Sequence, residues 1–101
     1  MAFQTVARFS ELLDGEGVCV EAGGKKLALF RMGDRCFAID ELCPHRDAPL
    51  HEGFCEGLEV QCPWHASRFS LETGAHRHPP AKKGVTAYPV RITDGDVQVD
   101  V

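Results

Sequence analysis

The sequence predicts an all-β protein whose short antiparallel strands form a small barrel or sandwich. Its apolar segments are short and rich in β-branched and aromatic residues, and turns that contain Gly or Asp separate them at close spacing. The length supports the same class, because 101 residues are enough for one hydrophobic core but not for two. We therefore expect a single domain over residues 1–101.

The first half of the chain carries the clearest strand signals. Gly23-Gly24 is a two-residue hairpin signal between two expected strands, and Gly33-Asp34 is a second turn. Ser10 is expected to be the N-cap of a one-turn helix that ends at Leu13. Strands are expected over residues 3–8, 18–22, 25–32 and 35–40.

The second half alternates turns with short strands in the same way. Residues 56–61 are expected to form a turn followed by a strand, and residues 71–74 and 93–96 are expected to be turns. Further strands are expected over residues 68–70, 85–92 and 97–101.

Two short Cys/His clips dominate the middle of the chain. The first is Cys43-Pro44-His45, and the second, Cys62-Pro63-Trp64-His65, follows after sixteen residues. Each clip offers one thiolate and one imidazole, which are ligands for soft and borderline metals. The set suits a [2Fe–2S] cluster with two cysteines on one iron and two histidines on the other. A Cys₂His₂ zinc site fits the spacing equally well, so spacing alone leaves both metals open.

The other cysteines and histidines have plainer expected roles. Cys19, Cys36 and Cys55 are expected to be free thiols that are buried as small apolar side chains. The remaining histidines are expected to be solvated polar residues rather than further ligands; they are His51, His76 and His78. Trp64 could stack on a partner or pack beneath its loop, and we expect it to pack beneath the loop and exclude water.

Charge and hydropathy exclude several functional classes. The net charge is −4 and no basic stripe is present, which argues against nucleic-acid binding. No Gly-rich phosphate loop precedes a helix, so a nucleotide site is not expected. The sequence contains neither a long apolar run nor an export signal at residues 1–5, so we expect a cytoplasmic protein without a membrane segment.

The segments around the two clips, residues 43–50 and 62–74, resemble Rieske iron–sulfur proteins. The resemblance is closest to the small Rieske ferredoxins and to the Rieske domains of bacterial aromatic-ring oxygenases, and it covers most of the chain. It implies the Rieske fold, with a cluster-binding subdomain of two loops over about residues 41–81. It also implies that a proline-containing loop over 78–81 covers one [2Fe–2S] cluster per chain. By the same resemblance, the cluster ligands are Cys43, His45, Cys62 and His65.

The high-potential members of that family carry an extra cysteine beside each clip, and the two extra cysteines form a disulfide. Trp64 stands at one of these positions and neither extra cysteine is present. The resemblance therefore implies the low-potential branch.

The function that the resemblance implies is one-electron transfer rather than catalysis. The chain would be a monomeric ferredoxin that takes electrons from an NAD(P)H-dependent flavin reductase and passes them to a terminal aromatic-ring oxygenase. It has no room for a second domain that would carry a mononuclear iron. Two alternatives remain: a small subunit of an assimilatory nitrite reductase, and a zinc-stabilised Cys₂His₂ interaction module.

Overall fold

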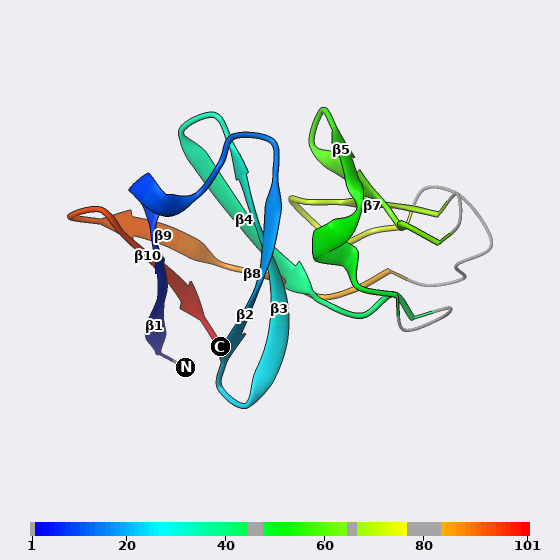
Figure 1. Cartoon of the computed structure of the whole chain (residues 1–101). Coiled ribbons are helices and arrows are strands. Elements are labelled where there is room, and N and C mark those ends of the chain that lie inside the picture. The colour runs from blue at the N-terminus through cyan, green and yellow to red at the C-terminus, as the bar shows by residue number, and fades with distance from the viewer. Residues whose placement is uncertain (1, 45–47, 65–66, 77–83) are drawn as a thin grey trace.

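The computed structural model describes residues 2–44, 48–64, 67–76 and 84–101. Antiparallel strands and two short 3₁₀ helices make up the secondary structure of these residues (Figure 1). In chain order the elements are β1 (Phe3–Arg8), η1 (Phe9–Glu11), β2 (Gly17–Ala22), β3 (Lys25–Met32), β4 (Arg35–Asp40), η2 (Leu50–Glu52), β5 (Phe54–Glu56), β6 (Glu59–Gln61), β7 (Arg68–Ser70), β8 (Ala87–Tyr88), β9 (Val90–Thr93) and β10 (Asp96–Asp100).

The central sheet has the strand order β2-β3-β4-β8 and is covered on both faces. Successive side chains of a strand point to opposite faces, so β3 contributes to two hydrophobic clusters. Leu27 and Leu29 lie in the cluster shared with β10, whereas Ala28 and Phe30 lie in the cluster shared with β6 and β7. All four side chains are fully buried. The central sheet therefore joins two hydrophobic cores.

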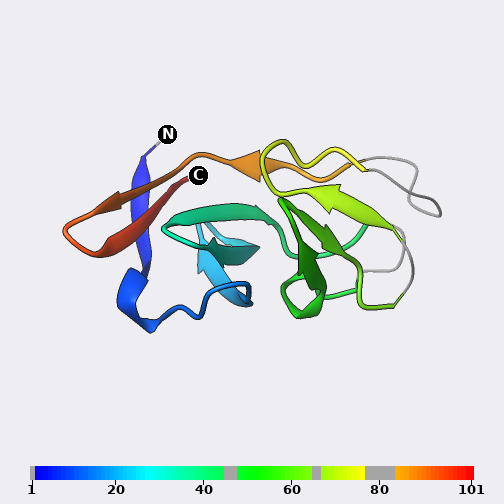
Figure 2. The same ribbon diagram turned by 90° about the horizontal axis from the view of Figure 1, so that it is seen from above.

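Each core is completed by a three-stranded sheet at one end of the molecule (Figures 1 and 2). The sheet β1-β10-β9 lies at the end that contains η1, and the sheet β5-β6-β7 lies at the other end. The predicted antiparallel β architecture is confirmed. The barrel alternative is not, because the strands of the described residues form separate open sheets.

Most of the predicted turns and strands are confirmed. Gly23 and Gly24 have φ angles of +59° and +75°, as a two-residue turn between β2 and β3 requires. Ser10 is not an N-cap: η1 begins at Phe9, and its N-cap residue Arg8 makes no side-chain capping bond. The Phe9 N–H donates instead to the carbonyl oxygen of Gly95 at 2.8 Å, so a distant turn replaces a local cap.

The strand predicted over residues 85–92 is in fact two strands in two sheets. β8 pairs with β4 of the central sheet, and β9 pairs with β10 of an outer sheet. Pro89 separates them, and it has no N–H to donate to a continuing ladder. Its carbonyl oxygen accepts a hydrogen bond from the Asp100 N–H at 3.0 Å. The chain thus changes sheets at this proline.

Two further elements had no expected counterpart, namely η2 and β5. Both lie between the two Cys/His clips. β5 pairs with β6, and β6 is the strand that was predicted within residues 56–61. No helix in the part of the chain described by the structure is long and apolar enough to cross a membrane.

Candidate metal centre

Cys43 and Cys62 begin two loops that the backbone closes in the same way. The Cys43 N–H donates to the carbonyl oxygen of Ala48 at 3.0 Å, and the Cys62 N–H donates to that of Ser67 at 2.8 Å. Each bond spans the same sequence separation and encloses one clip histidine. An isolated bridge between Leu42 and Pro49 stands beneath the first loop. The β6–β7 ladder lies next to the start of the second loop, so antiparallel pairing adjoins the root of each loop.

Both cysteine side chains are buried in the same hydrophobic cluster. Cys43 is 0% exposed and Cys62 is 1% exposed, and both belong to the cluster that contains Phe69 and Val60. A thiolate in such surroundings requires a compensating positive charge, because burying an unpaired charge is costly. A metal centre that binds both sulfurs supplies that charge. The donor type and burial of these cysteines therefore fit an iron–sulfur cluster.

The other two predicted ligands, His45 and His65, lie outside the described residues. So does the predicted covering segment over residues 78–81. Their assignment stays a prediction from the sequence.

The two chain segments that flank residues 77–83 are fastened together by backbone contact. The Val85 N–H donates to the carbonyl oxygen of Gly74 at 2.8 Å. A Cβ atom on Gly74 would lie 1.9 Å from the carbonyl oxygen of Val85, and a Cβ atom on Gly84 would lie 2.3 Å from that of Gly74. Two glycines are therefore needed for this approach.

Asp40, the last residue of β4, connects the segment after Val85 to the central sheet. Its two carboxylate oxygens accept hydrogen bonds from the Thr86 N–H at 2.9 Å and from the Tyr88 hydroxyl at 2.7 Å. Burial, followed by the hydrogen bond to Asp40 and its charge, raises the pKa of Tyr88 to about 12. These bonds hold β8 at the edge of β4.

The root of the first loop contains a polar cluster that sequence analysis missed. The carboxylate of Glu41 accepts the His51 backbone N–H at 3.0 Å and lies 2.5 Å from the His51 ring nitrogen Nδ1. The Glu41 side chain is 5% exposed and that of His51 is 25% exposed. The expectation that His51 is solvated is therefore wrong. His76 is exposed as expected, and His78 lies outside the described residues.

The three cysteines outside the clips are free thiols, as expected, but their burial differs. Cys36 is buried, and burial raises the pKa of the half-buried Cys55 to about 11. Cys19 is exposed, contrary to expectation. Its pKa is also raised, by partial desolvation and by the nearby Glu41 carboxylate.

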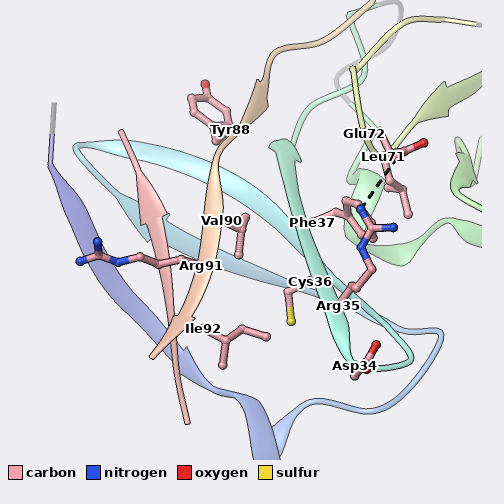
Figure 3. Close-up of a pocket in the computed structure, with 10 residues that line it drawn as sticks. All are labelled: Asp34, Arg35, Cys36, Phe37, Leu71, Glu72, Tyr88, Val90, Arg91 and Ile92. Atoms are coloured by element: carbon pink, nitrogen blue, oxygen red, sulfur yellow. Dashed lines mark ion pairs between the residues drawn. The ribbon is translucent and has the colours of Figure 1, made fainter. Parts of the chain in front are cut away.

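Figure 3 shows the surroundings of Cys36. Its sulfur points into a pocket between β4 and β9 that is lined by Val90 and Ile92, with the Arg35–Glu72 ion pair (3.9 Å) at the rim. Among the described residues, Cys36 belongs to no group of three metal-ligating side chains. This pocket therefore offers no second metal centre.

Trp64, inside the second clip, is 62% exposed. The expectation that it packs beneath the loop is wrong, because the space under the loop is filled by the buried cluster around Phe69. Leu42, next to Cys43, is 47% exposed. Each ligand loop thus presents an apolar side chain to solvent.

Comparison with known proteins agrees with this arrangement. The family model described as Rieske [2Fe-2S] domain matches residues 2–89. The anthranilate 1,2-dioxygenase ferredoxin subunit of Burkholderia cepacia is 42% identical over 90% of this chain and 84% of its own.

Two solved structures are similar over nearly the whole chain. The ferredoxin of carbazole 1,9a-dioxygenase from Nocardioides aromaticivorans IC177 has a TM-score of 0.93 and 32% identity, covering 98% of this chain and 97% of its own. A chain from a complex of reduced oxygenase and oxidized ferredoxin in carbazole 1,9a-dioxygenase has a TM-score of 0.88 and 30% identity, covering 96% and 91%. With two buried cysteines at the start of matching loops and a family match over most of its length, this chain belongs to the Rieske [2Fe-2S] domain family.

Proposed function

We propose that this protein is a Rieske ferredoxin that carries one electron at a time between the components of an aromatic-ring oxygenase system. The observation that carries the proposal is the pair of buried thiols, Cys43 and Cys62, at the start of two equivalently closed loops. Relatives that match nearly the full chain are ferredoxin components of dioxygenase systems. The chain is then an electron-transfer component and not an enzyme.

We assign Cys43 and Cys62 to one iron, and His45 and His65 to the other. When bound, the [2Fe–2S] cluster supplies a reversible one-electron couple. The two thiolates would balance the positive charge of the oxidised iron–sulfur core, so the whole centre would be neutral. Four thiolates would give the whole centre a net negative charge. Adding an electron therefore costs less than in an all-cysteine site, which raises the potential. The absence of the flanking cysteines supports the lower part of the Rieske range.

The polypeptide holds this ligand set by backbone geometry. The Cys43–Ala48 and Cys62–Ser67 hydrogen bonds fix the loop roots, and the apolar cluster beneath them excludes water from the sulfurs. We propose that electrons leave the protein through His45 and His65, because a histidine ligand on a surface loop can come close to a partner protein. The exposed side chains of Trp64 and Leu42, on the same loops, support contact with a partner there.

The partners we propose are an NAD(P)H-dependent flavin reductase as electron donor and a terminal aromatic-ring oxygenase as acceptor, with the ferredoxin acting as a monomer. The neighbour taken from an oxygenase–ferredoxin complex supports the acceptor. The nitrite reductase alternative has weaker support, because the curated relative with 42% identity is a dioxygenase ferredoxin.

The proposal is tested by the purified protein's metal content and spectra. We expect two iron atoms and two acid-labile sulfides per chain, a red-brown colour that bleaches with dithionite, and a rhombic EPR signal after reduction. A colourless protein with zinc in place of iron would support the zinc-stabilised module instead. The ligand assignment is tested by His45→Cys, which adds a negative charge to the centre and should lower the midpoint potential. An unchanged potential with an intact cluster would remove His45 from the ligand set.

A further inference from the structure

A second group of metal-ligating side chains lies beside the root of the first ligand loop. The sulfur of Cys19, a carboxylate oxygen of Glu41 and a ring nitrogen of His51 all lie within 4.8 Å of one another. Within the ranges that the structure describes, no other set of three Cys, His, Asp or Glu side chains meets this distance. We propose that these three residues form a second metal site, distinct from the two clips, that binds one Zn²⁺ or a similar borderline divalent cation.

The three residues come from separate parts of the chain that the fold brings together. Cys19 lies on β2, the edge strand of the central sheet, while Glu41 follows β4 and His51 lies in η2. η2 packs against β2, which brings the imidazole and the thiol to the same place. The group therefore contains three different kinds of metal ligand from three chain segments, whereas an ordinary surface cluster of acidic groups contains carboxylates alone.

The donor set suits zinc in type, number and charge. Sulfur, nitrogen and carboxylate oxygen are all zinc ligands, and three protein ligands plus a water molecule complete a tetrahedral site. A thiolate and a carboxylate together balance the charge of a divalent cation. The site thereby differs from the clips, which supply two sulfurs and two nitrogens.

The geometry needs only small side-chain movements to accept the ion. Bond lengths of about 2.0–2.3 Å place tetrahedral ligand atoms roughly 3.3–3.8 Å apart. The His51 Nδ1 and Glu41 Oε2 atoms are 2.5 Å apart and would separate by roughly 1 Å, with the cation replacing the hydrogen atom between them. The Cys19 sulfur lies no more than 4.8 Å from the other two ligand atoms, so it would move inward by at most about 1.5 Å, and its exposure leaves room to rotate.

The surroundings support a cation at this position. The Glu41 carboxylate is 5% exposed, so its charge is weakly screened by solvent. The other ring nitrogen of His51, Nε2, lies 3.8 Å from the carboxylate of the exposed Glu52, which is too far for a hydrogen bond but places a further acidic group beside the imidazole. The Leu50 N–H also donates to the carbonyl oxygen of Glu41 at 2.7 Å. A bound ion would therefore tie β2 to both ends of the loop that begins at Cys43.

The test is a calorimetric titration of the iron-loaded protein with zinc chloride. We expect one Zn²⁺ per chain with no loss of iron or of the visible spectrum. Cys19→Ala and His51→Ala should each weaken binding more than about 100-fold, because loss of an outer partner alone costs about 10–100-fold. Cys55→Ala and His76→Ala are matched controls, since neither side chain belongs to the group, and both should bind zinc like the original protein.

X-ray absorption at the zinc edge gives a second readout that does not depend on the variants. One sulfur among the zinc ligands, with the rest nitrogen or oxygen, supports the site. Two sulfurs, or zinc uptake matched by iron release, would place the ion in the clips and overturn the proposal. Absence of zinc binding, or equal binding by the Cys19→Ala variant, would overturn it as well. The number of sulfur ligands separates this proposal from the proposed function, because the Cys19 site offers one sulfur and the two clips offer two.

Discussion

The close approach of Gly74 to Val85 predicts how the protein responds to a substitution at Gly74. Gly74 has φ +80°, and Ala at this position would place its Cβ 1.9 Å from the Val85 carbonyl oxygen. The contacted atom belongs to the backbone, so no side-chain rotation relieves the clash. The two strands of chain must separate by about 1 Å to restore even a tight contact of 3.0 Å. We expect Gly74→Ala to break the Val85–Gly74 hydrogen bond.

The magnitude follows from two contributions. A Cβ atom at positive φ costs about 1 kcal/mol or somewhat more. Loss of the hydrogen bond together with the forced separation adds roughly 2 kcal/mol. The sum of about 3 kcal/mol corresponds to a fall of roughly 12–24 °C in the apparent Tm, at 4–8 °C per kcal/mol for a domain of this size.

Gly15→Ala provides the matched control. Gly15 also has φ +80°, but a Cβ atom there would meet nothing within 4 Å. This variant has only the conformational cost, so its Tm should fall by roughly 4–8 °C. The assay is the thermal transition of the cluster-loaded protein, followed by circular dichroism at one heating rate for all variants.

The difference between the two variants isolates the backbone clash. We also expect visible absorbance to fade faster in Gly74→Ala than in Gly15→Ala at one temperature below both transitions, because the segment that flanks residues 77–83 is no longer fastened. If the two variants melt within a few degrees of each other, the Gly74–Val85 contact does not hold this part of the fold together, and the reasoning is wrong.

Three further predictions concern single side chains. Trp64→Ala should weaken binding to the proposed terminal aromatic-ring oxygenase by roughly 30-fold at an unchanged midpoint potential. Leu13→Ala, at an exposed apolar residue shortly after η1, should leave both the binding and the potential unchanged. Tyr88 is the only tyrosine, so ¹³C NMR of its ring should show titration near pH 12. The folded state keeps the Tyr88 proton more tightly than the unfolded state, so the free energy of unfolding should fall as the pH rises from about 10 to about 12. Asp40→Asn should lower the pKa of Tyr88 without restoring its ordinary value of 10, because burial is the larger cause of the shift. Iodoacetamide should alkylate Cys55 far more slowly at pH 8 than it alkylates a free thiol in a model peptide, because a pKa of about 11 leaves little thiolate; equal rates would contradict this.

Local signals in the sequence were sufficient for most of the strands, but not for β5 or for the division of residues 85–92 into two strands. Gly23-Gly24 marked its hairpin because positive φ at both positions is a property of the residues themselves. The two clips indicated metal binding because thiolate and imidazole ligands at short spacing have few other uses. The two histidine ligands remain predictions, since His45 and His65 lie outside the described residues.

The sequence by itself determined the β class, the turn positions and the chemistry of the two clips, because each depends on residues that are neighbours in the chain. Tertiary structure alone decided that Pro89 divides a strand between two sheets, that Glu41 buries its charge against His51, and that Gly74 has no room for a side chain. Those features depend on atoms that are brought together from distant parts of the chain. A local sequence pattern does not show how closely two distant segments approach each other. The proposed metal site at Cys19 and the contact between Gly74 and Val85 could therefore be identified only from the folded protein.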